Sequence, residues 1–173
     1  MVKRVCFLVV SGLILGYLTS CDSSSGSTDF IGGADFSLSV SPSQIDTGDR
    51  TQVKLELNEI HPDGIIIKIR FPSELSYVEG STELEVAEEE IELAPNFLVT
   101  DENDDWYLVF FLDEDLFGFE EEGVLTLELR AVDELEGGEI ELDVDIRDTD
   151  SFDVNQPEFS PEDSDFIEVG SST

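Results

Sequence analysis

Positive charge is scarce in this sequence: eight lysine and arginine residues face 42 aspartate and glutamate residues among 173, which gives a formal net charge of −34. Histidine and tryptophan each occur once, and cysteine occurs twice. A surface this acidic repels the phosphate backbone, so nucleic acid is excluded as a partner. One histidine and two cysteines also leave little material for a catalytic triad, a zinc site or a disulfide framework.

Hydrophobic runs of membrane-spanning length are missing as well. The apolar stretch from Val5 to Leu18 is short, because a helix that crosses a bilayer needs about 20 residues. It follows Lys3 and Arg4 and leads into small residues, which is the three-part layout of an export signal. We therefore expect residues 1–20 to be a cleaved signal peptide.

The end of this segment, Leu-Thr-Ser-Cys at residues 18–21, resembles the lipobox of bacterial lipoproteins. The resemblance implies cleavage between Ser20 and Cys21, lipid attachment at Cys21, and an extracytoplasmic, membrane-anchored location in the bacterial cell envelope. Two or more acyl chains hold such an anchor stably. The alternative is an ordinary secretory signal with a chance cysteine. Asp22 resembles the inner-membrane retention signal of enteric bacteria, although other lineages sort differently, so the choice of membrane stays open.

The remaining chain divides into a tether and one folded domain. Residues 21–34 comprise the lipidated cysteine and a Ser/Gly-rich linker, residues 35–170 the domain, and residues 171–173 a tail. Because Cys6 leaves with the signal and Cys21 carries lipid, the domain has no thiol, and its stability must come from packing. Abundant phenylalanine supplies that core.

From Asp35 onward, apolar and polar residues alternate with a period of two, and no long helical period appears. The segments 36–40, 52–57 and 65–71 are the clearest strands, and the turn His61-Pro62-Asp63-Gly64 precedes the third. Further expected strands are Leu84–Ala87, Ile91–Leu93 with Phe97–Val99, Trp106–Leu112, Val124–Ala131, Glu139–Ile146 and Phe166–Val169. The pattern predicts an all-β fold, an antiparallel β-sandwich of about eight to nine strands, with Gly137-Gly138 between two of them and an irregular loop over residues 148–165.

Three segments resemble cohesin-like or immunoglobulin-like modules of bacterial surface proteins. Residues 71–81, FPSELSYVEGS, match the turn Pro-x-x-Leu-x-Tyr-Val-x-Gly-Ser, residues 123–127 read Gly-Val-Leu-Thr-Leu, and residues 166–170 resemble a final edge strand. The resemblance implies a sandwich fold and a protein-binding role. No binding residue of the family carries over to a position here, since these motifs describe the fold.

Catalysis is not expected. His61, the only histidine, lies in a turn, and a carboxylate enzyme needs one acid with a raised pKa in an apolar cleft, of which the sequence gives no sign. Calcium binding has more support in the sequence than catalysis, because two acidic segments offer oxygen ligands. Their candidate ligands for weak binding are Asp101, Asn103, Asp105, Asp148, Asp150 and Asp153. Neither segment has the glycine and glutamate of an EF-hand, and the alternative is that these are solvated loop acids, so no cofactor is required.

The segment Trp106–Leu112 is apolar on both faces. Either Tyr107, Val109 and Phe111 lie beneath a loop or neighbouring strand, or they form an exposed patch for a partner. Lys68 and Arg70 are expected cross-strand partners of acids and, in so negative a field, cations that a partner could contact.

Taken together, these features predict a non-catalytic, lipid-anchored binding or adhesion module with a protein or polysaccharide partner. The alternatives are a carbohydrate-binding sandwich, which needs an exposed aromatic strip, and a carboxylate glycoside hydrolase, which needs a cleft. The acidity has two interpretations. It is either a recognition surface for cations or basic partners, or an adaptation to high salt.

Overall fold

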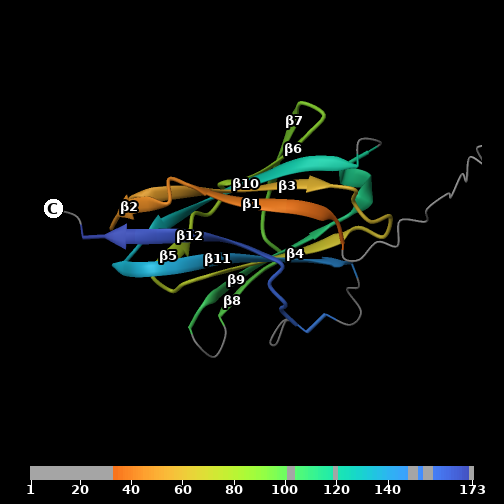
Figure 1. The fold of residues 1–173 in the computed structure, drawn as a ribbon. Coiled ribbons are helices and arrows are strands. Elements are labelled where there is room, and N and C mark those ends of the chain that lie inside the picture. Colours follow the sequence, from red (N-terminus) through yellow and green to blue (C-terminus); the bar gives the residue numbers. More distant parts are fainter. Residues whose placement is uncertain (1–32, 101–103, 119–120, 148–151, 154–157, 172–173) are drawn as a thin grey trace, which may run out of the picture.

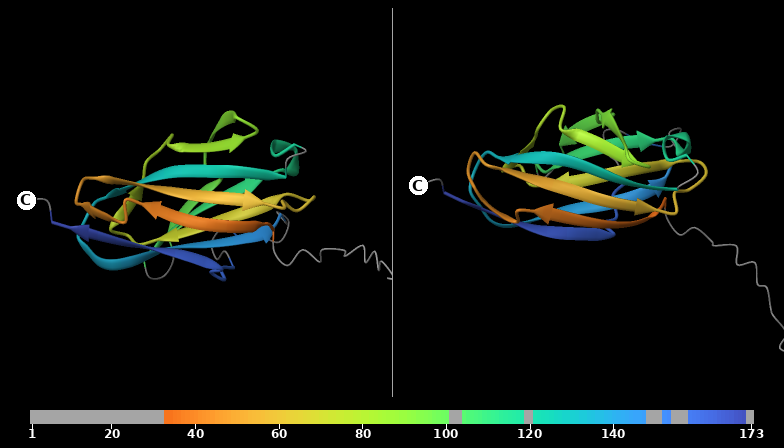
Figure 2. Two further views of the ribbon diagram at one scale, coloured as in Figure 1. Left: turned by 45° about the horizontal axis from the view of Figure 1, so that its top comes forward. Right: turned by 90° about the horizontal axis from the view of Figure 1, so that it is seen from above.

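The computed structural model describes residues 33–100, 104–118, 121–147, 152–153 and 158–171. They form two packed β-sheets, as Figures 1 and 2 show, and the predicted β-sandwich is confirmed. The proposed signal peptide, Cys21, Asp22 and the linker up to residue 32 lie outside the described residues. Among the described residues, no helix is long and apolar enough to cross a membrane.

Each sheet contains six strands. The first sheet runs β1 (Asp35–Ser41), β3 (Arg50–Asn58), β10 (Glu122–Ala131), β6 (Thr82–Val86) and β7 (Glu89–Leu93), with β5 (Leu75–Tyr77) also paired to β10. The second runs β2 (Gln44–Asp46), β12 (Asp163–Gly170), β11 (Leu135–Ile146), β4 (Ile65–Phe71), β9 (Trp106–Leu112) and β8 (Phe97–Thr100). All pairs are antiparallel except β2 with β12, which is parallel. One 3-10 turn, η1, covers Glu114–Leu116.

The strand count exceeds the prediction for two local reasons. The short strands β2 and β5 carry too few residues for alternation to mark them. The segments expected together over residues 91–99 belong to different sheets, because the chain leaves β7 at Leu93 and enters β8 at Phe97 in the other layer. Gly137-Gly138 is no separator either: it lies inside β11, where the register with β12 shifts between Leu135 and Gly138.

Alternation places the apolar face of each sheet in a shared core. Val53, Leu55 and Leu57 of β3 and Ile67 and Ile69 of β4 are 0 to 1% exposed. Burying each such side chain contributes about 1.5 to 3 kcal/mol to the free energy of folding. Residues 35–170 contain no cysteine, so this burial takes the place of disulfide bonds in stabilising the domain.

The side of the sandwich formed by β1 and β12 is closed by carboxylates. Asp163 and Asp165 on β12 face the outer edge of β1 and accept the backbone N–H groups of Leu38 and Val40 at 2.8 and 2.7 Å. An edge strand normally leaves such donors available to another chain. Here the acids satisfy them and join the two sheets.

The outer face of the second sheet is covered by residues 152–153 and 158–162, which we call the covering segment. The ring of Phe152 packs on Phe97 and Phe111, with centroids 5.8 and 5.1 Å away, and the ring of Phe159 packs on Tyr107 at 5.3 Å. The cover explains why β9 is apolar on both faces: Tyr107, Val109 and Phe111 lie beneath it, as one of the two sequence interpretations held.

Candidate functional site

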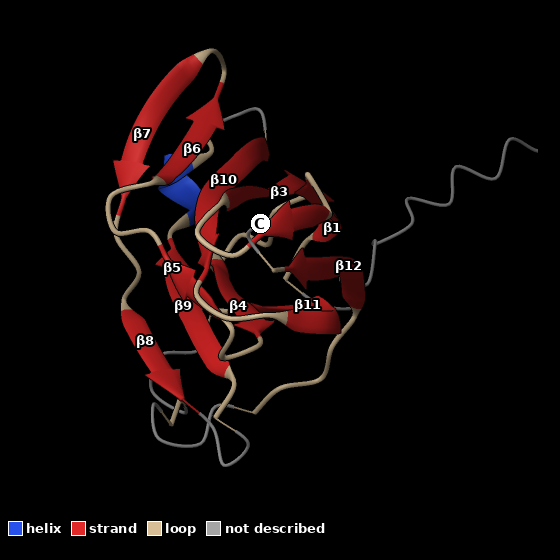
Figure 3. Cartoon of the chain, turned by 90° about the vertical axis from the view of Figure 1, so that its left-hand side faces the viewer, coloured by secondary structure: helices blue, strands red, loops and turns tan. Residues whose placement is uncertain are grey.

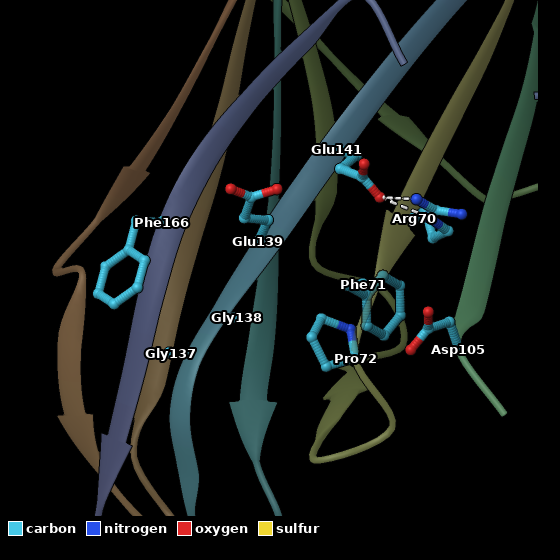
Figure 4. A pocket seen from close by; sticks show the side chains of 9 residues that line it. All are labelled: Arg70, Phe71, Pro72, Asp105, Gly137, Gly138, Glu139, Glu141 and Phe166. Atoms are coloured by element: carbon cyan, nitrogen blue, oxygen red, sulfur yellow. Dashed lines mark hydrogen bonds and ion pairs between the residues drawn. The ribbon is translucent and has the colours of Figure 1, made fainter. Parts of the chain in front are cut away.

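A hollow of about 390 Å³, which we call the distal hollow, lies at one end of the second sheet (Figure 4). It is formed where β4 ends, β9 begins and β11 runs beside β12. Its lining residues are Arg70, Phe71, Pro72, Asp105, Gly137, Gly138, Glu139, Glu141 and Phe166. These nine residues offer apolar walls, carboxylates and one guanidinium, but no thiol, hydroxyl or imidazole. The hollow can therefore bind a group that has both apolar and charged parts.

The two glycines of β11 make the hollow possible. Gly137 has a φ of +87°, which favours glycine, and a Cβ atom there would lie 3.2 Å from the ring of Phe166. At Gly138 a Cβ atom would lie 2.6 Å from Leu135 and 3.0 Å from Pro72. The bulge thus leaves a floor without side chains, beside which the ring of Phe166 stands 47% exposed.

The guanidinium of Arg70 is held in place on the opposite wall. It pairs with Glu141, its cross-strand neighbour on β11, and donates to the Tyr107 hydroxyl at 3.4 Å. Its Cζ atom lies 4.8 Å from the centroid of the Phe159 ring. Burial lowers the pKa of Arg70, but the hydrogen bonds with Tyr107 and Glu141 outweigh it and raise the pKa, so the cation is permanent. Glu139, across from it, is in no ion pair among the described residues.

Lys68 does not reach this hollow or the surface. Its side chain is 2% exposed, and its Nζ atom lies 2.7 Å from Asp143 and 2.6 Å from Asp145, both on β11. It also donates to the Glu158 carbonyl of the covering segment, and the Ser160 N–H donates to Asp143 at 2.8 Å. Burial raises the pKa of Asp143, although Lys68 and Ser160 oppose that shift.

Two expectations about the sheet surface are thereby corrected. Lys68 is a cross-strand partner of acids, but it is no contact for a partner, because the covering segment closes over it. Tyr107 and Val109 are 6% and 0% exposed and Phe111 is partly buried, so the exposed-patch interpretation fails for them. Arg70, whose side chain is 27% exposed, does line a hollow that a partner can enter.

Four of the six candidate calcium ligands lie outside the described residues. Asp101, Asn103, Asp148 and Asp150 lie outside the described residues, while Asp105 lines the distal hollow and Asp153 follows Phe152 in the covering segment. Among the described residues, no group of three or more His, Cys, Asp or Glu side chains could hold a metal ion. Weak calcium binding therefore stays a prediction.

His61 lies at the end of the molecule opposite the hollow, in the predicted turn. The Gly64 N–H donates to its carbonyl at 2.8 Å, and its Nδ1 atom accepts the Asp63 N–H at 3.1 Å. The histidine therefore belongs to the turn that enters β4.

Sequence reasoning missed the residues that shape the hollow. The sequence predicts Phe166 in a final edge strand and Gly137-Gly138 between two strands. In the structure β12 lies between β2 and β11, and the two glycines lie inside β11 beside the exposed ring of Phe166. The signal that could have found them is a glycine pair within an otherwise alternating strand, which marks a bulge.

No family model matches this sequence, and no curated protein does either. Among solved structures, the chain is similar to the N-terminal domain of the Streptococcus gordonii adhesin Sgo0707, with a TM-score of 0.49 and 15% identity over 78% of this chain and 32% of that one. For a non-cellulosomal cohesin from Archaeoglobus fulgidus the TM-score is 0.46 and the identity is 14%, over 80% of this chain and 93% of that one. For AvmM, which catalyses macrocyclisation in alchivemycin A biosynthesis, the TM-score is 0.44 and the identity is 12%, over 81% of this chain and 89% of that one.

The present chain thus spans about a third of the length of the adhesin chain. All three TM-scores are below 0.5, and the three proteins include an enzyme as well as an adhesin and a cohesin. These similarities concern architecture and assign no activity.

Proposed function

We propose that this protein is a non-catalytic lipoprotein, anchored through Cys21 on the extracytoplasmic side of a bacterial membrane, that binds a protein partner through the distal hollow. The anchoring half of the proposal is supported by the lipobox-like residues 18–21 and the Ser/Gly-rich linker. The binding half is supported by an exposed ring and a fixed guanidinium around a preformed hollow.

The observation that carries the proposal is the position of the hollow. The described chain starts at Gly33, whose N–H donates to the Val144 carbonyl near one end of β11, and Gly138 of the hollow lies near the other end (Figure 1). Six residues of strand separate the two positions, about 20 Å at roughly 3.4 Å per residue. A domain tethered at its Gly33 end presents the hollow away from the membrane.

A polysaccharide partner is the second candidate, favoured by one observation: the exposed ring of Phe166 stands beside hydrogen-bonding groups of Glu139 and Arg70. Such a module uses a flat strip of several aromatic rings. Among the described residues the large apolar side chains that are exposed are Phe166, Leu98 and Val132, of which Phe166 alone is aromatic. A carboxylate enzyme is less well supported, because the buried acid with a raised pKa, Asp143, is paired with Lys68.

Two experiments test the two halves separately. Cys21→Ser should move the protein out of the membrane fraction or stop its processing; normal processing with unchanged membrane partitioning would refute the anchor. A photo-crosslinking residue placed at Phe166 of the anchored protein should give a discrete product in whole cells, which excess purified domain competes away. The same residue at Ser39, on the outer face of β1, should give none. Equal products at both positions would refute the hollow as the binding site.

A further inference from the structure

Apart from the three-residue strand β5, which pairs only with β10, the two sheets have four outer edge strands, and three of them are protected. The edge of β1 is occupied by the Asp163 and Asp165 carboxylates. β7 carries Glu89, Glu90 and Glu92, and β2 is only three residues long. Short, charged or covered edges are the means by which proteins avoid unwanted strand pairing.

The fourth edge, that of β8, carries no charged side chain, and among the described residues no carboxylate occupies its outer side. Its sequence is Phe-Leu-Val-Thr, without charge or proline, and β8 is the last strand of its sheet. It is held firmly on its inner side: the Asn96 N–H donates to the Val109 carbonyl at 2.8 Å, and the Asn96 side chain accepts the Phe111 N–H at 2.7 Å. Among the described residues, nothing pairs with its outer side. β8 is therefore a fixed template for an added strand.

A groove of about 660 Å³, which we call the side groove, lies beside this edge. It is lined by Tyr77, Leu93, Pro95 and Leu98, with Glu79 and Glu92 at its rim. Leu98 pairs with Leu108, a core residue, so its side chain faces the space between the sheets, yet it is 43% exposed. Figure 3 shows why: the β6–β7 hairpin stands away from β8 on this side of the molecule. The core is left unsealed between β7 and β8.

The charge of the chain selects the occupant. Of the six lysine and arginine residues in the described part, Arg50, Lys54, Lys68, Arg70 and Arg147 are ion-paired with acids. Glu79 and Glu92 are in no ion pair among the described residues. A second copy, carrying a net charge of −34, would be repelled from this rim, whereas lysine or arginine side chains would be attracted.

We propose that the β8 edge and the side groove bind an extended, basic segment of a partner protein, which adds to the second sheet as a further strand. Its backbone pairs with residues 97–100. Alternate apolar side chains enter the groove against Leu93 and Leu98, where they complete the seam of the core. Lysine or arginine side chains near the rim pair with Glu79 and Glu92. This surface is separate from the distal hollow, and the inference does not depend on the proposed function.

The test uses the full-length protein and three blocked nine-residue peptides. The first alternates lysine and valine, the second glutamate and valine, and the third lysine and glycine, which keeps the charge but lacks strand-forming side chains. Hydrogen exchange of residues 97–100 should slow at least tenfold with the lysine–valine peptide, less so at 0.5 M salt, and little with the other two. Equal protection by the glutamate peptide, or protection of residues 89–93 instead, would overturn the proposal.

Two variants with the same change of charge sharpen this test. Leu98→Arg places a cation in the groove and should weaken binding of the lysine–valine peptide at least tenfold. Ser39→Arg, on the outer face of β1, should weaken it less than threefold, and Leu98→Met should bind like the parent. Unchanged exchange of β3 would show that each variant is folded. Equal weakening by the two arginine variants would mean that general charge attraction, and not the β8 edge, carries the binding.

Discussion

The two sides of the sandwich are closed in different ways. Between β1 and β12, the side chains of Asp163 and Asp165 cross from one sheet to the backbone of the other. Between β7 and β8, Leu93 and Leu98 face the space between the sheets and stay partly exposed, while Glu79 and Glu92 remain at the rim. Acidic residues therefore serve two purposes here. Where they meet backbone donors they close the fold, and where they meet none they give an open apolar groove a negative border.

The largest effect is expected at the covered outer face, which is also closed by charge. Lys68→Met would leave Asp143 buried without a counter-charge, and breaking a buried ion pair costs about 3 to 5 kcal/mol. Urea denaturation should report that loss. The double variant Lys68→Met with Asp143→Leu should recover most of it, and a loss below about 1 kcal/mol in the single variant would contradict a closed outer face.

The closed side can be opened directly. The double variant Asp163→Ala with Asp165→Ala removes the acceptors of the Leu38 and Val40 N–H groups, at about 1 to 3 kcal/mol for each donor left without a partner. We expect a loss of about 2 to 5 kcal/mol in the free energy of unfolding, together with concentration-dependent association through β1. The asparagine double variant keeps an acceptor at each position and should lose less. Equal losses would mean that charge, and not the hydrogen bonds, matters.

A matched pair of leucines compares the two sides at the same change. Leu38 is 9% exposed on the closed side, and Leu98 is 43% exposed on the open side. Leu38→Ala should cost about 2 to 4 kcal/mol and Leu98→Ala about 1 kcal/mol, since the cost of truncation follows the apolar surface and cavity involved. Chemical denaturation measures the free energy of unfolding of both variants. Similar losses would show that the β7–β8 side is sealed.

The smallest effect concerns Glu162 of the covering segment. Burial, together with the neighbouring Asp143 and Asp145, raises the pKa of Glu162 above its ordinary value of 4.5. The folded chain therefore binds this proton more tightly than the unfolded chain does. The resulting stabilisation is fully present below pH 4.5 and is lost as pH rises through the folded pKa. Glu162→Gln should accordingly flatten the change in unfolding free energy between pH 7 and pH 5, and an unchanged profile would count against the shift.

Much of the fold could be predicted because alternation is a local signal. Ile65–Phe71 and Trp106–Leu112 were expected with the bounds that the structure gives them. The turn before β4 was predicted from Pro62 and Gly64, and the cover over Tyr107 and Val109 was one of two interpretations that the sequence left open. What could not be predicted depends on register: Lys68 meets Asp143 only because β4 and β11 pair at a separation of 75 residues.

The site depends on the same kind of distant geometry. Asp163 and Asp165 alternate with Ser164 and Phe166 as solvated strand acids would, and their contacts with β1 join residues 125 positions apart. Phe166 reaches the distal hollow only because a bulge at Gly137 shifts the pairing of β11 with β12. Neither arrangement has a local signature in the sequence.

Residue-resolved hydrogen exchange of the full-length protein, before and after adding the lysine–valine peptide, compares the two sides most directly. The Leu38 and Val40 amides should be protected throughout, although they lie on an outermost strand, because Asp163 and Asp165 accept them. The outward amides of residues 97–100 should exchange rapidly in the protein alone and become protected with the peptide. Rapid exchange at Leu38 and Val40, or full protection of β8 without any peptide, would contradict a sandwich that is sealed on one side and open on the other.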